Sequence, residues 1–231
     1  MIAKTLNSHS EINCGWEWTS HMSTLSRIKK VKAGLSGYFK DLPEPHASKM
    51  QEKSEISTIG FRLLFSSSPK WFMSPQFSLA HLGERLNGFI KFLNRQPNIK
   101  IIHIVRNDHL EWLASLFMAR SSKMFINKEY PRDLTISVPI KEAVKRVRAK
   151  LEIEKRLREL RISNPYLEVR YEDAIADREV TYRQLFQFLE VDVPKLIPPA
   201  ATKKQQQRPI YEVIVNFDDL RQRIAKLLIS P

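Results

Sequence analysis

The chain has 231 residues, 42% of them hydrophobic, and a formal net charge of +13 at pH 7. This length and apolar share predict a single domain over residues 1–231 and exclude wholesale disorder. The positive excess favours an anionic partner such as a nucleotide, a nucleic acid or a membrane surface, although a generally basic soluble surface explains it equally well.

The cysteines and histidines of the chain limit which disulfides and metal sites it can form. The single cysteine, Cys14, excludes an internal disulfide and a multi-cysteine metal site, and it is consistent with a reducing, cytoplasmic location. The six histidines are scattered without metal-ligand spacing, so no metal is expected. No apolar run reaches the roughly 18 residues of a membrane span, and residues 1–12 lack the apolar stretch of a signal peptide.

In chain order, the pattern predicts a polar loop over 40–55, a strand over 58–65, and a helix over 79–93. A strand over 99–105, a helix over 144–160, a strand over 166–171 and a helix over 182–189 follow. A basic, proline-containing loop over 195–209 precedes a last helix over 220–228. Strands alternating with helices predict an α/β fold with a parallel central sheet flanked by helices.

The strongest chemical signal is the segment IKIIHIVRNDHLEWLASLF, residues 99–117. Its strand ends at Val105, Arg106 follows, and a helix begins around Asp108. Ligands gather at the carboxyl ends of parallel strands, a helix start offers unpaired N–H groups, and an arginine fork suits phosphate oxygens. Equally open is the reading that Arg106 only pairs with a carboxylate such as Asp108. His103, inside the strand, is expected to be a satisfied core residue.

An apolar strand, Arg-Asn, and a helical serine nine residues after the arginine together resemble the 3′-phosphate-binding segment of sulfotransferases that use 3′-phosphoadenosine 5′-phosphosulfate (PAPS). The resemblance implies that Arg106 and Ser115 bind the 3′-phosphate. Many members place the serine one position earlier, where this chain has Ala114.

Three further segments resemble the same family in the same order. TLNSHSEINCGWEW, residues 5–18, places Glu17 where related enzymes have the general base. VRYEDAIADREVTYRQLFQFLEVD, residues 169–192, resembles a segment that reflects fold rather than catalysis. TKKQQQRPIYEVIVNFDDL, residues 202–220, resembles a C-terminal element whose basic loop closes over the nucleotide, which nominates Lys203 and Lys204.

The resemblance implies a P-loop sulfotransferase-like enzyme that moves a sulfuryl group from PAPS to a hydroxyl or amine of a carbohydrate or small molecule. The family's first strand and its Arg/Lys-Ser-Gly-Thr/Ser turn, which hold the 5′-phosphosulfate, have no counterpart in the sequence. We therefore expect a domain that is incomplete at its N-terminus. Its partners would be the donor nucleotide and the acceptor, without nucleic acid and without a membrane span.

Two alternatives stay open. One is an inactive sulfotransferase-like fragment. The other is a basic nucleic-acid- or anion-binding module that uses KEAVKRVRAKLEIEKRLRELR, residues 141–161, as an amphipathic helix with a heavily basic polar face. The sequence specifies neither the acceptor nor the oligomeric state.

Overall fold

The computed structural model describes residues 2, 6, 12–14, 58–60, 87, 90, 91, 93–124, 130, 131, 133–197 and 208–229. The predicted loop over 40–55 and most of the predicted helix over 79–93 lie outside these residues. The chain forms two compact units. Unit 1 contains Met1–His103, Lys155–Leu167 and Asp177–Ala201, and unit 2 contains Ile104–Glu154, Glu168–Ala176 and Thr202–Pro231.

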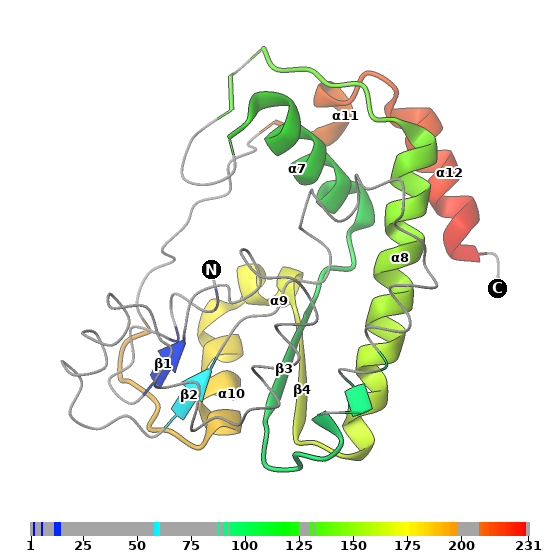
Figure 1. Cartoon of the computed structure of the whole chain (residues 1–231). Helices are drawn as coiled ribbons and strands as arrows, with labels where there is room; N and C mark the ends of the chain where they lie inside the picture. The colour runs from blue at the N-terminus through cyan, green and yellow to red at the C-terminus, as the bar shows by residue number, and fades with distance from the viewer. Residues whose placement is uncertain are drawn as a thin grey trace. The chain divides into compact units, whose positions relative to one another are not determined.

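The described elements are four strands, six α-helices and one 3₁₀ turn (Figure 1). In order they are β1 (Ile12–Cys14), β2 (Thr58–Gly60), β3 (Ile101–Val105), α7 (His109–Ser122), α8 (Ile140–Arg158), the 3₁₀ turn η1 (Glu159–Ile162), β4 (Tyr166–Arg170), α9 (Tyr171–Ala176), α10 (Arg178–Leu189), α11 (Ile210–Val213) and α12 (Phe217–Ile229).

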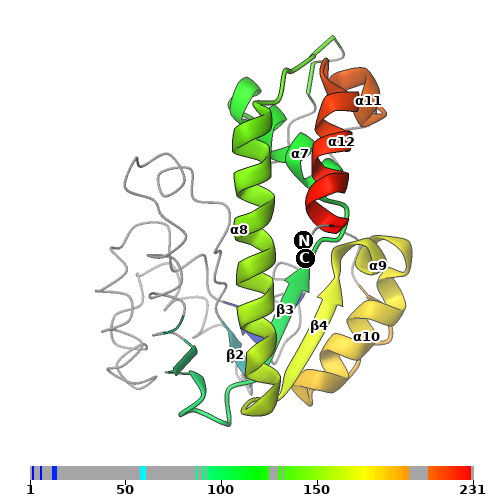
Figure 2. The same cartoon turned by 90° about the vertical axis from the view of Figure 1, so that its right-hand side faces the viewer.

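The described strands form two pairs. β1 and β2 are parallel, with Ile12 opposite Thr58 and Cys14 opposite Gly60. β3 pairs with β4, and Figure 2 shows both arrows running in the same direction. Parallel strands need a crossover connection, which α7 and α8 provide between β3 and β4. The predicted α/β class, with parallel strands and flanking helices, is confirmed.

In unit 1, local hydrogen bonds explain where β3 and β4 begin. The Asn164 side-chain amide donates to the carbonyl of Gln96 at 2.8 Å, and the Ile101 amide donates to the Pro165 carbonyl at 2.9 Å. His103 is buried and hydrogen-bonded to the Tyr166 hydroxyl, which confirms it as a satisfied core residue.

Unit 2 has a continuous apolar core built from α7, α8, α11 and α12. Asn216, just before α12, accepts from the Val138 amide and donates to the Val138 carbonyl, both at 2.9 Å, and so holds the C-terminal helices to the segment that enters α8. The buried members of this core are Leu113, Ala114, Phe117, Met118, Tyr130, Ile136, Val138, Ala143, Val147, Val213, Ile214, Leu220 and Ile224.

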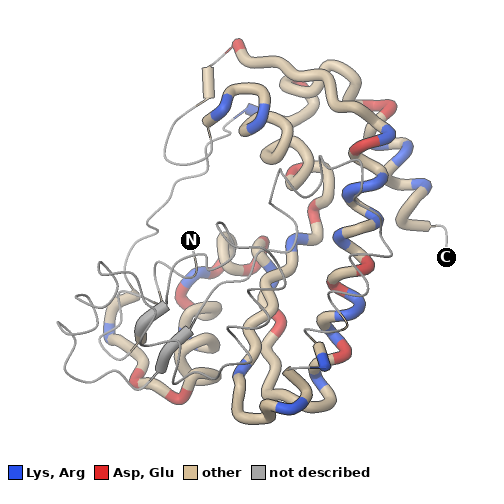
Figure 3. The backbone as a smooth tube through the Cα atoms, viewed as in Figure 1, with Lys and Arg blue, Asp and Glu red and all other residues tan. Residues whose placement is uncertain are grey.

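The charges of α8 are divided between its two sides, and Figure 3 shows how densely they follow the helix. Arg146 and Lys150 are only 2% and 7% exposed, and they pair with Glu142 and Glu154 at 2.6 Å each. The heavily basic polar face predicted for this helix therefore does not include these two cations, because they lie on the packed side. The exposed cations of α8 are Lys141, Lys145, Arg148 and Lys155.

Within the described residues no helix is long and apolar enough to cross a membrane.

Helix α10 offers a test of local stability. Asp177 caps it, accepting from the Val180 amide at 3.0 Å through its side chain. We expect Asp177→Ala to lower the free energy of unfolding by about 1 kcal/mol, because an amide at the helix start loses its acceptor. Asp177→Asn keeps the acceptor and should lose little. Urea unfolding followed by circular dichroism measures both, and equal losses in the two variants would contradict the capping role.

Candidate anion site after strand β3

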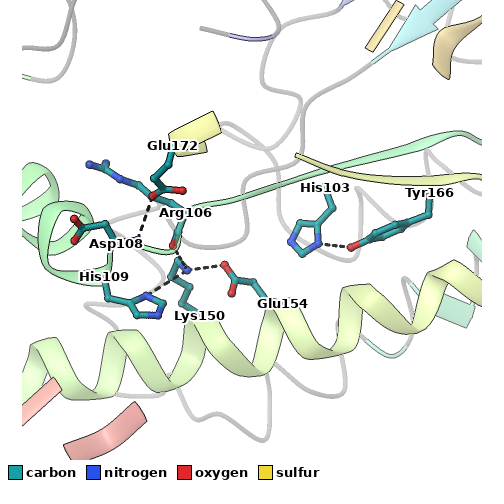
Figure 4. Close-up of polar contacts among 8 residues, drawn as sticks. All are labelled: His103, Arg106, Asp108, His109, Lys150, Glu154, Tyr166 and Glu172. Atoms are coloured by element: carbon teal, nitrogen blue, oxygen red, sulfur yellow. Dashed lines mark hydrogen bonds and ion pairs between the residues drawn. The ribbon is translucent and has the colours of Figure 1, made fainter. Parts of the chain in front are cut away.

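The candidate site lies in unit 2, where residues 106–108 connect the end of β3 to the start of α7 (Figure 4). The Arg106 side chain is 19% exposed and its guanidinium lies over the Tyr171 ring, 4.7 Å from the ring centroid. Its Nη2 is 3.7 Å from a Glu111 carboxylate oxygen, and its Nε is buried without a hydrogen-bond partner. Arg106 is thus placed at the strand end with donor capacity that its neighbours do not use.

The carboxylate that Arg106 meets is Glu111, whereas the sequence reading named Asp108 as an example. Charge-assisted N–H···O bonds are about 2.7–2.9 Å long, so a separation of 3.7 Å marks a loose pair. Asp108 instead turns to the helix, accepting from the Glu111 amide at 2.8 Å as the N-cap of α7.

The first amides of α7 were predicted to be unpaired, and for two of them this is wrong. The Glu111 amide is bound by Asp108, and the Asp108 amide donates to Glu172 at 3.1 Å. Carboxylates are favourable at a helix start because the N-terminal end of the helix dipole is positive. The chain's own acids therefore occupy these two amides.

Glu172, at the start of α9, belongs to the Tyr-Glu-Asp segment that sequence reasoning assigned to fold alone. Burial raises the pKa of Glu172, but hydrogen bonds from the amides of Asp108, Glu172 itself and Asn107, with the charge of Arg106, outweigh it and hold the pKa below the usual range. Glu172 is accordingly an ionised anchor that fixes the start of α7. Its proximity to Arg106 could not be read from the sequence, where 66 positions separate them.

Lys150, on α8, is the other residue that sequence reasoning missed. Its ammonium donates to the Arg106 carbonyl at 2.8 Å and to Glu154 at 2.6 Å, and it lies 3.5 Å from His109 Nδ1. Lys150 follows Val147 by three positions, on the apolar side of the helix. The sequence could have indicated this buried pair, because Lys150 falls on the apolar side of the helix and Glu154 follows it by four positions.

Ser115 and Ala114 occupy opposite environments on α7. Ala114 is fully buried in the core, whereas Ser115 is exposed. Ser115 follows Glu111 by four positions and therefore neighbours it on the helix surface. Glu17, Lys203 and Lys204, the other predicted site residues, lie outside the described residues.

The part of the chain that the structure describes holds no cluster of metal-binding side chains.

Comparison with known proteins identifies the class. A sequence model described as the Sulfotransferase family matches residues 1–195. Since that match spans most of the chain, the protein belongs to the sulfotransferase family. A solved structure described as "Sulfotransferase Domain from the Curacin Biosynthetic Pathway" is 18% identical, with a TM-score of 0.39, over 94% of this chain and 80% of that one. No curated protein matches the chain.

His109, the first residue of α7, provides a pH test of this geometry. Burial and the charge of Lys150 lower its pKa below 6.5, against the opposing influence of Asp108 and Glu172. An unfolded chain then holds more protons than the folded one between the folded pKa and 6.5. Stability from His109 is therefore complete above 6.5 and is lost as the pH falls through that window.

We expect an NMR titration of the ring to give a pKa below 6.5, with the signal identified by its loss in His109→Gln. The same variant should flatten the dependence of the unfolding free energy on pH in this window. A pKa at or above 6.5 would contradict the burial of the ring beside Lys150.

Proposed function

We propose that this sulfotransferase takes its sulfuryl group from PAPS and delivers it to a hydroxyl or amine of a carbohydrate or small molecule. Membership of the family supports sulfuryl transfer in general. The observation that carries the choice of donor is Arg106, whose buried Nε has no hydrogen-bond partner at the carboxyl end of β3. A planar fork with a free donor suits the 3′-phosphate that distinguishes PAPS from ordinary adenine nucleotides.

Helix phase supports Ser115 rather than Ala114 as the second 3′-phosphate ligand. Arg106 approaches Glu111, and Ser115 is exposed one turn further along α7, about 5 Å on. A phosphate bound by the guanidinium beside this face is within reach of the serine hydroxyl. Ala114 has no donor, and its side chain packs into the core.

The charges around Arg106 indicate what else the site needs. Asp108, Glu111 and Glu172 bring three carboxylates to a region where Arg106 supplies one cation, while Lys150 is matched by Glu154. A phosphate dianion would therefore be repelled unless further cations approach it. We assign that part to Lys203 and Lys204, and proton acceptance from the acceptor hydroxyl to Glu17. When bound, PAPS supplies the sulfuryl group. The lysines bind and orient the nucleotide, and Glu17 takes the proton from the acceptor hydroxyl.

The competing reading, a nucleic-acid-binding module built on α8, receives less support. Two of its cations, Arg146 and Lys150, are buried in ion pairs and are unavailable to a phosphate backbone. We propose instead a cytoplasmic enzyme domain over residues 1–231 whose partners are the nucleotide and the acceptor.

Calorimetric titration with adenosine 3′,5′-bisphosphate tests the proposal. We expect Arg106→Ala to raise the dissociation constant at least tenfold, about 1.4 kcal/mol, because the guanidinium fork is lost. Ser115→Ala should raise it about threefold, since a single neutral hydrogen bond is removed. Arg148→Ala, which removes an exposed cation of α8, is the matched control and should change the constant less than twofold.

Equal effects of Arg106→Ala and Arg148→Ala would mean that binding follows general charge, and the proposed site would be wrong. Absence of binding by the folded wild-type chain would favour the inactive-fragment alternative. Binding of RNA with a steep salt dependence, together with no preference for the 3′-phosphate, would favour the nucleic-acid module.

Glu111 gives an opposite prediction for the same titration. Because its carboxylate lies against Arg106, Glu111→Gln should tighten bisphosphate binding, roughly threefold to tenfold, by removing a charge that repels the phosphate. Glu179→Gln on α10 changes the net charge equally and serves as the control, with an expected change below twofold. Weaker binding by Glu111→Gln would show that the carboxylate supports the ligand rather than competing with it.

A further inference from the structure

Lys150 is a buried cation whose contacts converge on the backbone of the proposed site. It is 7% exposed, and a lysine in such a position is costly unless its charge is paired and its donors are used. An ammonium has three donors. They face the Glu154 carboxylate at 2.6 Å, the Arg106 carbonyl at 2.8 Å and His109 Nδ1 at 3.5 Å, and Nζ also lies 5.8 Å from the centre of the Trp112 ring.

The Arg106 carbonyl is the contact that links α8 to ligand binding. Arg106 follows the last residue of β3 and precedes α7, so its carbonyl belongs to neither the strand nor the helix. A donor from Lys150 satisfies it, while Glu172 holds the Asp108 amide two residues further on. Figure 4 shows both contacts on the segment between the strand and α7. The backbone of the turn is therefore held at two points by side chains of α8 and α9.

The Arg106 side chain itself is held much less firmly. Its ion pair with Glu111 spans 3.7 Å, and its Nε makes no hydrogen bond. Its guanidinium lies over the Tyr171 ring, 4.7 Å from the ring centroid, so its direction is set by this stacking and by the backbone from which the side chain departs. Misplacement of a binding group by about 1 Å is enough to weaken a ligand interaction substantially.

We propose that Lys150, with Glu154 as its counter-ion, is a positioning residue that fixes the Arg106 backbone and thereby sets affinity for the 3′-phosphate of the nucleotide. This inference rests on the function proposed above. A buried ion pair contributes little net stability compared with apolar residues of similar size, so stability alone does not account for the pair. Its bond to the Arg106 carbonyl gives it a use in binding.

The test removes both charges together, because Lys150→Met alone would leave Glu154 buried and unpaired. The variant is Lys150→Met/Glu154→Leu. The control is Arg146→Met/Glu142→Leu, one turn away on α8, which removes the buried Arg146 and its partner Glu142 without touching residues 106–108; the Glu142 side chain is 38% exposed and also pairs with Arg120. Circular dichroism and thermal unfolding confirm that each variant is folded before binding is measured.

Binding of two nucleotides, one with and one without a 3′-phosphate, distinguishes loss of Arg106 positioning from general damage to the fold. We expect the Lys150 variant to raise the dissociation constant for adenosine 3′,5′-bisphosphate about tenfold and that for adenosine 5′-phosphate less than twofold. In an Arg106→Ala background the same double substitution should add nothing, because the group that Lys150 positions is gone. A bisphosphate constant within twofold of wild type, or an equal loss with Arg106 absent, would overturn the proposal.

A measurement without ligand keeps the inference separate from the proposed function. Backbone NMR order parameters of Arg106 and Asn107 should fall from about 0.85 to below about 0.7 in the Lys150 variant and stay near 0.85 in the control. Unchanged order parameters would overturn the positioning role whatever the nucleotides do. If the order parameters fall in the Lys150 variant but the wild-type protein does not prefer adenosine 3′,5′-bisphosphate to adenosine 5′-phosphate, the positioning role stands and the proposed donor is wrong.

Discussion

The structure of the site depends on how the chain satisfies the backbone of residues 106–108, which belong to neither β3 nor α7. Backbone groups outside strands and helices lack a ladder partner and take side chains or water as partners instead. Charged side chains meet this requirement: Lys150 on the Arg106 carbonyl and Glu172 on the Asp108 amide. These side chains come from separate helices, α8 and α9. The turn therefore takes its final form only when both helices have packed.

One consequence is electrostatic. Asp108 and Glu172 accept from the Glu111 and Asp108 amides, so two carboxylates of the protein already stand at the positive end of the α7 dipole. Under the proposed function, we expect the Arg106 guanidinium and the Ser115 hydroxyl to bind the phosphate.

The sequence predicted elements and strand ends better than it predicted partners. Periodicity and turn residues located β3, β4, α8, α10 and α12, and the positions of Val105 and Arg106 followed from them. The partners Lys150 and Glu172 escaped prediction because a charge on a helix is normally solvated. Which charges turn inward depends on what packs against the helix, and that is tertiary information. The assignments of Arg106 and Ser115 came from family resemblance and stay predictions.

The net charge of +13 and the local charge of the site act at different ranges. Exposed cations such as Lys141 and Arg148 contribute to a long-range field that attracts any anion, but salt screens this field beyond about 8–10 Å. Close to Arg106, the carboxylates of Glu111 and Glu172 repel an anion that cannot use the guanidinium fork. Under the proposed function, attraction at a distance combined with repulsion at contact would select a ligand whose phosphate matches the fork, because other anions do not recover the cost of approaching those acids.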